Sequence, residues 1–157
     1  MHIHPFSIVP TISFILIFFL GLFVLFHNPR SKLNITFFFM CLTIAFWNAY
    51  YITYNFNINN QYVFFCTLAS YCAINFIPIT MLAFIAEFLN INWIKKWNIL
   101  NFIYGTYISL LILTTPYIID GLIQYSWGYI PKAGKYHPYY LIYFFILILI
   151  FIGVLID

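Results

Sequence analysis

Few side chains in this sequence could perform acid–base or nucleophilic chemistry. Its only acidic residues are Glu87, Asp120 and Asp157. Glu87 and Asp120 lie at opposite ends of a long apolar segment, so they cannot act as a carboxylate pair. The zinc-protease, serine-hydrolase, P-loop and dinucleotide-binding motifs are missing from the sequence. The sequence therefore predicts no catalytic centre in this chain.

Histidines and cysteines are the other residues that could do chemistry, as metal ligands. Cys66 and Cys72 are six positions apart, which places them on different faces of a helix, and Cys41 stands alone in an apolar run. We expect all three to be small buried residues. His2 and His4 could bind a metal weakly, but a solvated tail is the simpler interpretation. We predict neither a metal nor a cofactor.

The composition explains why chemistry is scarce. Of the 157 residues, 65% are hydrophobic and 6% are charged, whereas soluble domains carry roughly 25% charged residues. The mean hydropathy is +0.99. A chain with so few charges cannot cover a water-exposed surface, so the lipid bilayer is its expected environment. The net charge of +3 is too small and too scattered to indicate nucleic acid as a partner.

The apolar runs predict an all-α fold, a polytopic transmembrane helical bundle of about five spans in one membrane domain over 1–157. Each run is long enough to cross the bilayer, which takes about 20 residues. No basic residue precedes the first run and no small-x-small site follows it, so we expect this span not to be a cleaved signal. The predicted spans are 8–26, 33–53, 62–88, 99–119 and 138–155.

Basic residues predict the orientation in the membrane. The first and third loops hold Arg30, Lys32, Lys95 and Lys96, and the fourth holds two lysines. Because cytoplasmic loops are enriched in lysine and arginine, the first and third loops are expected inside. The protein is then a multi-pass cell-membrane protein with its N-terminus outside and its C-terminus in the cytoplasm.

Within the third predicted span, Asn75 precedes Pro78 by three residues. Proline removes a backbone donor and bends a helix, and asparagine can form hydrogen bonds to a neighbouring helix. Two interpretations stay open, a flexible switch in a signalling helix and a fixed structural kink. Gly105 and Ser109 have a small-xxx-small spacing that would allow another helix to approach closely.

Glu87 ends the same span and also has two interpretations. It could be a proton or ion site, because an acid inside a membrane is costly. The interpretation that we favour places it at the cytoplasmic headgroups, beside Lys95 and Lys96.

The longest polar stretch is the fourth loop, from Asp120 to His137. Its aromatic residues supply rigid apolar contact area, and its lysines could attract an anion. We predict that Trp127, Tyr129, Lys132 and His137 bind a ligand, while an interfacial lid is an equally weighted alternative.

Several stretches together resemble the seven-helix N-terminal membrane region of sensor histidine kinases, which also heads some diguanylate cyclases. GLFVLFHNPR at 21–30 resembles the end of the family's first helix, and FFFMCLTIAFW at 37–47 resembles its second. FIPITMLAF at 76–84 resembles the third helix, with its proline. WGYIPKAGKYHP at 127–138 resembles the outer loop and is the most specific match.

This resemblance implies a sensory input domain that passes a signal to a cytoplasmic output. The implied partners are a cytoplasmic kinase or cyclase output module, or a second copy of the chain as a dimer. The family has seven spans and this chain shows about five, so a fragment, a truncated gene product and a reduced relative all stay open. A small transporter or channel subunit is the alternative function, but such a protein should show more charge inside its helices.

Overall fold

A computed structural model describes residues 5–52, 60–125 and 128–156 of the chain. All five of its helices are long and apolar enough to cross a membrane. The predicted fold class is therefore confirmed, and the protein is a multi-pass membrane protein. In chain order the elements are α1 (Pro5–His27), α2 (Lys32–Ile52), α3 (Asn60–Phe88), α4 (Asn92–Thr114), β1 (Ile119–Tyr125), β2 (Gly128–Ala133) and α5 (His137–Ile156).

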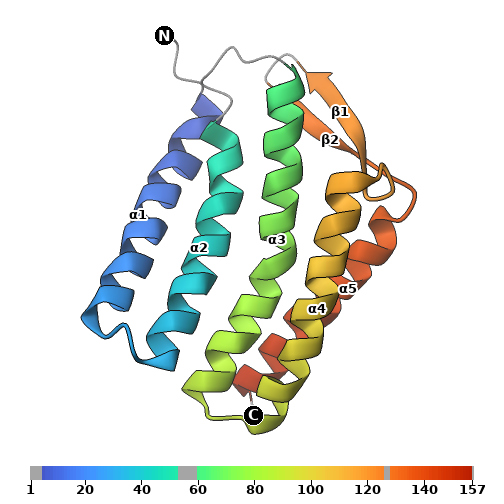
Figure 1. Cartoon of the computed structure of the whole chain (residues 1–157). Helices are drawn as coiled ribbons and strands as arrows, with labels where there is room; N and C mark the ends of the chain where they lie inside the picture. The colour runs from blue at the N-terminus through green and yellow to red at the C-terminus, as the bar shows by residue number, and fades with distance from the viewer. Residues whose placement is uncertain (1–4, 53–59, 126–127, 157) are drawn as a thin grey trace.

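The helices are arranged around α3 (Figure 1). Helix α1 packs on α2, α2 packs on α3, and α3 in turn contacts both α4 and α5. Two buried clusters hold this centre together. One lies toward the β-strands and includes Leu68, Ile112 and Tyr140. The other lies toward the opposite end and includes Leu82, Ile94 and Leu147. Because lipid tails are as apolar as these side chains, close packing rather than the hydrophobic effect holds the helices together.

Two short turns close the end of the bundle that holds the first and third loops, here called the basic end. Between α1 and α2, the Asn28 side-chain oxygen accepts a hydrogen bond from the Arg30 backbone, and Ser31 accepts one from Asn34 at the start of α2. Between α3 and α4, Asn90 adopts a left-handed conformation with φ 55°. Asparagine tolerates this conformation at helix ends, and so α3 ends there.

The predicted bounds of the fourth span, 99–119, were wrong at both ends. Helix α4 already begins at Asn92, so Lys95 and Lys96 lie in its first turns rather than in a loop. Long lysine side chains near a helix end can reach the membrane interface, which is why their charge does not stop the helix. At the other end Pro116 forces an extended conformation on Thr115, whose φ and ψ are −138° and 153°, and α4 ends before it.

The fourth loop contains an antiparallel β-hairpin that the sequence analysis did not predict. Strands β1 and β2 pair with Ile123 opposite Ile130, and the register is irregular between Ile119 and Leu122. The hairpin crosses one end of the bundle (Figure 1), here called the hairpin end. Gly134, which follows β2, lies against the segment between α4 and β1, because its backbone N–H donates to the Ile118 carbonyl at 2.9 Å. A Cβ at position 134 would lie 2.3 Å from the Pro116 carbonyl oxygen, so only glycine fits this approach.

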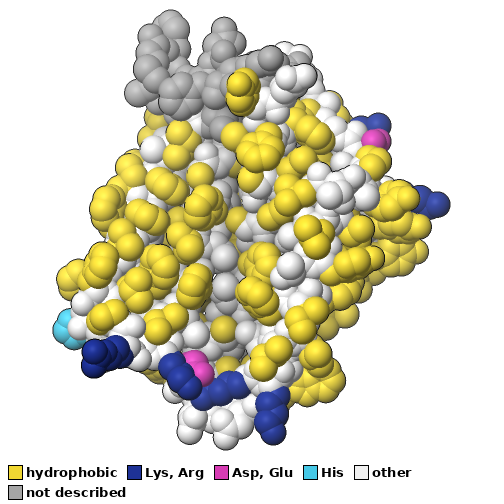
Figure 2. All heavy atoms as spheres, viewed as in Figure 1, with side chains coloured by type: hydrophobic (Ala, Val, Ile, Leu, Met, Phe, Trp, Pro, Cys, Tyr) yellow, Lys and Arg dark blue, Asp and Glu magenta, His cyan; other side chains and the backbone are white. Residues whose placement is uncertain are grey.

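The surface has the pattern of a membrane protein. Figure 2 shows hydrophobic side chains over the flank of the bundle and charged side chains at its two ends. Exposed aliphatic and aromatic residues such as Phe23, Leu100 and Leu149 therefore face the lipid. The bilayer is the environment that this surface requires.

Candidate functional site: the hairpin end of the bundle

The charged residues of the hairpin neutralise one another. The Lys132 ammonium lies 2.8 Å from a carboxylate oxygen of Asp120, and each side chain is about half exposed. Asp120 is on β1 and Lys132 on β2, so the pair bridges the two strands. An anion that approached Lys132 would have to compete with this carboxylate. Exposed pairs of this kind contribute about 0–1 kcal/mol, so the competition is not prohibitive.

Tyr129 lies on the opposite side of the hairpin, toward α2. Its backbone carbonyl accepts a hydrogen bond of 2.9 Å from the Tyr50 hydroxyl. Beneath it a cavity of about 340 Å³ is bounded by α2, α3 and β2. Its walls include Trp47, Tyr51 and Tyr71. This volume is at the lower limit of typical small-molecule sites, about 300–1,000 Å³.

His137 begins α5 and anchors it to the segment between α4 and β1. Its Nδ1 atom lies 3.1 Å from the Ile118 carbonyl oxygen. Its ring lies 6.0 Å from the Tyr71 ring of α3 and 5.8 Å from the Tyr140 ring, measured between centroids. His137 is therefore the predicted residue with the most direct contact to α3.

The structure places three of the four predicted ligand-binding residues at one end of the bundle, but not in one pocket. Tyr129 faces the cavity beside α2, Lys132 is exposed on the hairpin, and His137 packs against Tyr71. Trp127 lies outside the described residues. Of the three described residues, Tyr129 and Lys132 lie on β2, and His137 begins the helix that follows the hairpin.

The predicted switch residues lie deeper, at the centre of the bundle. Asn75 is 1% exposed, and its amide nitrogen donates to the Gly105 carbonyl at 2.7 Å and to the Ser109 hydroxyl at 3.1 Å. Its amide oxygen has no hydrogen-bond partner among the described residues. Pro78 follows less than one turn later and is fully buried. Gly105 and Ser109 are thus the small residues that allow α4 to approach, as their spacing predicted.

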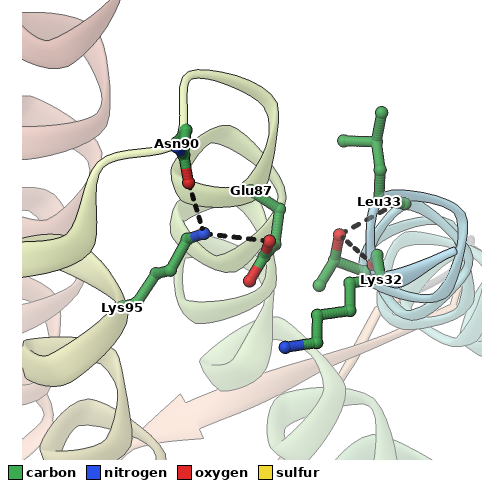
Figure 3. A network of polar contacts seen from close by, with 6 residues as sticks. Lys32, Leu33, Glu87, Asn90 and Lys95 are labelled. Atoms are coloured by element: carbon green, nitrogen blue, oxygen red, sulfur yellow. Dashed lines mark hydrogen bonds and ion pairs between the residues drawn. The ribbon is translucent and has the colours of Figure 1, made fainter.

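At the basic end, Glu87 at the end of α3 forms an ion pair with a lysine of α4. Lys95 reaches back from α4 to within 3.0 Å of its carboxylate and to within 3.1 Å of the Asn90 side-chain oxygen. Figure 3 shows these contacts, with Lys32 of α2 extending toward the same region. The structure thus places Glu87 beside Lys95, as the headgroup interpretation expected, and its position relative to the headgroups stays a prediction.

The comparisons with known proteins give one result. The model of the family described as the N-terminal 7TM region of histidine kinase matches residues 9–157. This chain belongs to that family. No curated protein and no solved structure matches the chain.

Membership in the histidine kinase 7TM region family establishes a membrane sensory input domain. The family region is the non-catalytic, signal-receiving part of its proteins. The transporter alternative receives no support. In the described part of the chain, one ion pair joins the last turn of α3 to the start of α4 and the other joins the two strands of the hairpin, so both lie toward the ends of the bundle.

Several residues of the hairpin end were not predicted from the sequence. Tyr50, Tyr71 and Tyr140 were not among the predicted site residues. The pairing of Asp120 with Lys132 was not predicted either. A period-two alternation around Ile119–Tyr125 and Gly128–Ala133 was the only available signal for a hairpin that would bring these residues together. That signal is weak here because the glycines and the lysines interrupt the alternation.

Proposed function

We propose that this sensory domain receives its stimulus at the hairpin end and transmits it along α3 to a cytoplasmic output. In this proposal Trp127, Tyr129, Lys132 and His137 form the recognition surface. The observation that supports it best is the contact of His137 with Tyr71, because α3 is the helix that runs from the hairpin to the basic end and packs against α2, α4 and α5.

Asn75 and Pro78 are the proposed switch within α3. Asn75 lies one helical turn from Tyr71, and Pro78 follows it, so a shift of the Tyr71 ring acts directly on the bent part of the helix. A ligand shifts such an equilibrium only by its differential affinity for the two states. The recognition surface must therefore bind differently when α3 changes its bend.

The orientation and the partners are part of the same proposal. The hairpin end faces the outside of the cell, and the basic end and the C-terminus face the cytoplasm, because four basic residues lie at the basic end and two on the hairpin side. The partners are a cytoplasmic kinase or cyclase output module, or a second copy of this chain. The chain by itself is proposed to have no catalytic activity, so the purified protein incubated with ATP should not become phosphorylated.

A fusion protein tests the recognition and switch residues. The chain is joined at its C-terminus to the kinase core of a histidine kinase, and autophosphorylation is measured in membrane vesicles. His137→Ala and Pro78→Ala should each change the kinase activity by several-fold, because they alter the two ends of the proposed relay. His27→Ala is the matched control, since His27 is exposed at the basic end.

Two results would count against the proposal. Unchanged activity in His137→Ala would remove the hairpin end from the signalling route. Unchanged activity in Pro78→Ala alone would make the bend of α3 structural and place the switch elsewhere.

A further inference from the structure

A furrow between α4 and α5 is lined mainly by tyrosines. It has a volume of about 480 Å³, within the range of small-molecule sites. It lies near the hairpin end, on a flank of the bundle that the proposed recognition surface does not include. The tyrosines are Tyr104, Tyr107, Tyr117, Tyr136, Tyr139 and Tyr140, and aliphatic walls are provided by Ile108, Leu111 and Ile118.

This furrow is open toward the lipid. Tyr107 on α4 and Tyr139 on α5 are 56% and 68% exposed, and both helices are membrane spans. A tyrosine ring offers an apolar face, and its hydroxyl prefers a hydrogen-bond partner. A molecule that enters from the bilayer would therefore meet apolar rings and several hydroxyl groups in one place.

A cation lies beside the mouth of the furrow. The Lys135 ammonium is 5.8 Å from the centroid of the Tyr136 ring, and Tyr136 lines the furrow. The two ion pairs of the described residues join Lys95 to Glu87 and Lys132 to Asp120, so Lys135 belongs to neither. Its charge is available to an anionic group at the membrane interface.

The other end of the furrow is closed toward the membrane centre. The Tyr104 ring contacts the Tyr143 ring of α5 edge-on, at 4.6 Å between centroids. Beyond this contact lies a separate, apolar cavity of about 360 Å³, lined in part by Trp97 and Tyr143. A transmembrane helix is about 10–12 Å wide and would need a groove along the whole bundle, so the interrupted furrow fits a smaller molecule better.

From these features we propose that the furrow binds a single-chain anionic amphiphile of the bilayer, of the class of long-chain fatty acids. Its carboxylate pairs with the Lys135 ammonium and accepts hydrogen bonds from the tyrosine hydroxyls at the mouth of the furrow. The alkyl chain lies along Ile108 and Leu111 and ends near Tyr104. The mouth of the furrow holds one cation, and the furrow itself ends at the Tyr104–Tyr143 contact. These features match a lipid with one negative charge and one alkyl chain, rather than a phospholipid with two chains.

Photolabelling of the full chain in nanodiscs tests this site. The probe is a palmitic acid analogue with a diazirine in its alkyl chain, and the labelled peptides are identified by mass spectrometry. We expect labelling within 104–118 and 136–143 that unlabelled palmitic acid competes away. Leu111→Trp fills the furrow and should lower this labelling about three- to tenfold. Leu110→Trp is the control, because Leu110 is 55% exposed on the same helix and does not line the furrow.

The charge is tested separately by a surface substitution that should leave folding intact. Lys135→Ala should lower the labelling several-fold, because it removes the charged contact to the carboxylate. Lys96→Ala, which changes an exposed lysine at the basic end, should leave it unchanged. Equal labelling of all four variants and the unaltered chain would overturn the site. Labelling by a photoactivatable phosphatidylglycerol but not by the fatty acid probe would overturn the single-chain assignment.

Discussion

Asn75 is a polar side chain buried in the middle of a membrane helix, and its amide nitrogen donates both of its hydrogen bonds to α4. The two acceptors, the Gly105 carbonyl and the Ser109 hydroxyl, are both within 3.1 Å. Lipid offers no alternative partner, so these bonds specify which face of α4 meets α3. Its oxygen has no partner among the described residues.

Replacing Asn75 by alanine should therefore weaken the contact between α3 and α4. Because hydrogen bonds between membrane helices contribute about 0.6–2 kcal/mol, we expect Asn75→Ala to lower the free energy of unfolding by about 1 kcal/mol. This free energy is measured by titrating the protein with SDS in mixed micelles while its helix content is monitored. Asn48→Ala is the control, since Asn48 donates only to Ile44 of its own helix and should cost less. A smaller loss for Asn75→Ala than for Asn48→Ala would contradict this account.

Helix α3 is held on both sides at the height of its proline. On one side, the Thr80 hydroxyl lies 3.1 Å from the Thr43 hydroxyl of α2. On the other, Gly105 allows α4 to approach so closely that an added Cβ would lie 2.6 Å from the Ile79 side chain. Proline breaks the regular hydrogen bonding of α3 between these contacts. The neighbouring helices therefore determine how far α3 can bend.

A methyl group at position 105 should push α3 and α4 apart. We expect Gly105→Ala to destabilise the protein by about 1–3 kcal/mol, the usual cost of overpacking. Adding Ile79→Val should restore part of this loss, because it removes the terminal methyl that the new Cβ meets. The measurement is a double-mutant cycle on the free energy of unfolding. Gly153→Ala is the matched control, since nothing lies within 4 Å of its Cβ position. Additive effects of the two substitutions would argue against this contact.

The whole molecule has two unlike ends. The basic end has short turns, with the Glu87–Lys95 pair between α3 and α4. The hairpin end has a folded β-structure and aromatic cavities. A sensor needs one end to receive a stimulus and the other to contact an output, and α3 connects the two (Figure 1). Which end faces the cytoplasm stays a prediction from the basic residues.

Cysteine labelling can test that orientation. In a chain whose three native cysteines are replaced, a cysteine at Lys135 should react with a membrane-impermeant maleimide in intact cells. A cysteine at Lys96, which is exposed in α4, should react only after the cells are permeabilised. The expectation follows from the positive-inside rule. Reaction at position 96 but not at position 135 in intact cells would reverse the orientation.

The sequence alone determined the membrane environment and the five helices, because both depend on local composition. A run of about 20 apolar residues in lipid must form a helix, because only a helix satisfies all of its backbone hydrogen bonds within the segment. This holds whatever its neighbours are. It also indicated that Asn75 could form hydrogen bonds to a neighbouring helix and that the Gly105–Ser109 spacing could allow close approach, whereas a kink and a switch at Pro78 both stayed open. Its errors lay at the edges of α4, where lysine snorkelling and a proline moved the bounds.

Only the tertiary structure decided what faces what at the hairpin end. Tyr50 and Tyr129 are far apart in sequence, yet one bonds to the other. The furrow likewise brings together tyrosines of α4 and tyrosines of α5, which the hairpin separates in the sequence. The physical reason is that aromatic residues at a membrane interface satisfy the local pattern equally well on every helix face. Packing of distant segments selects the face, and no local signal in the sequence records that choice.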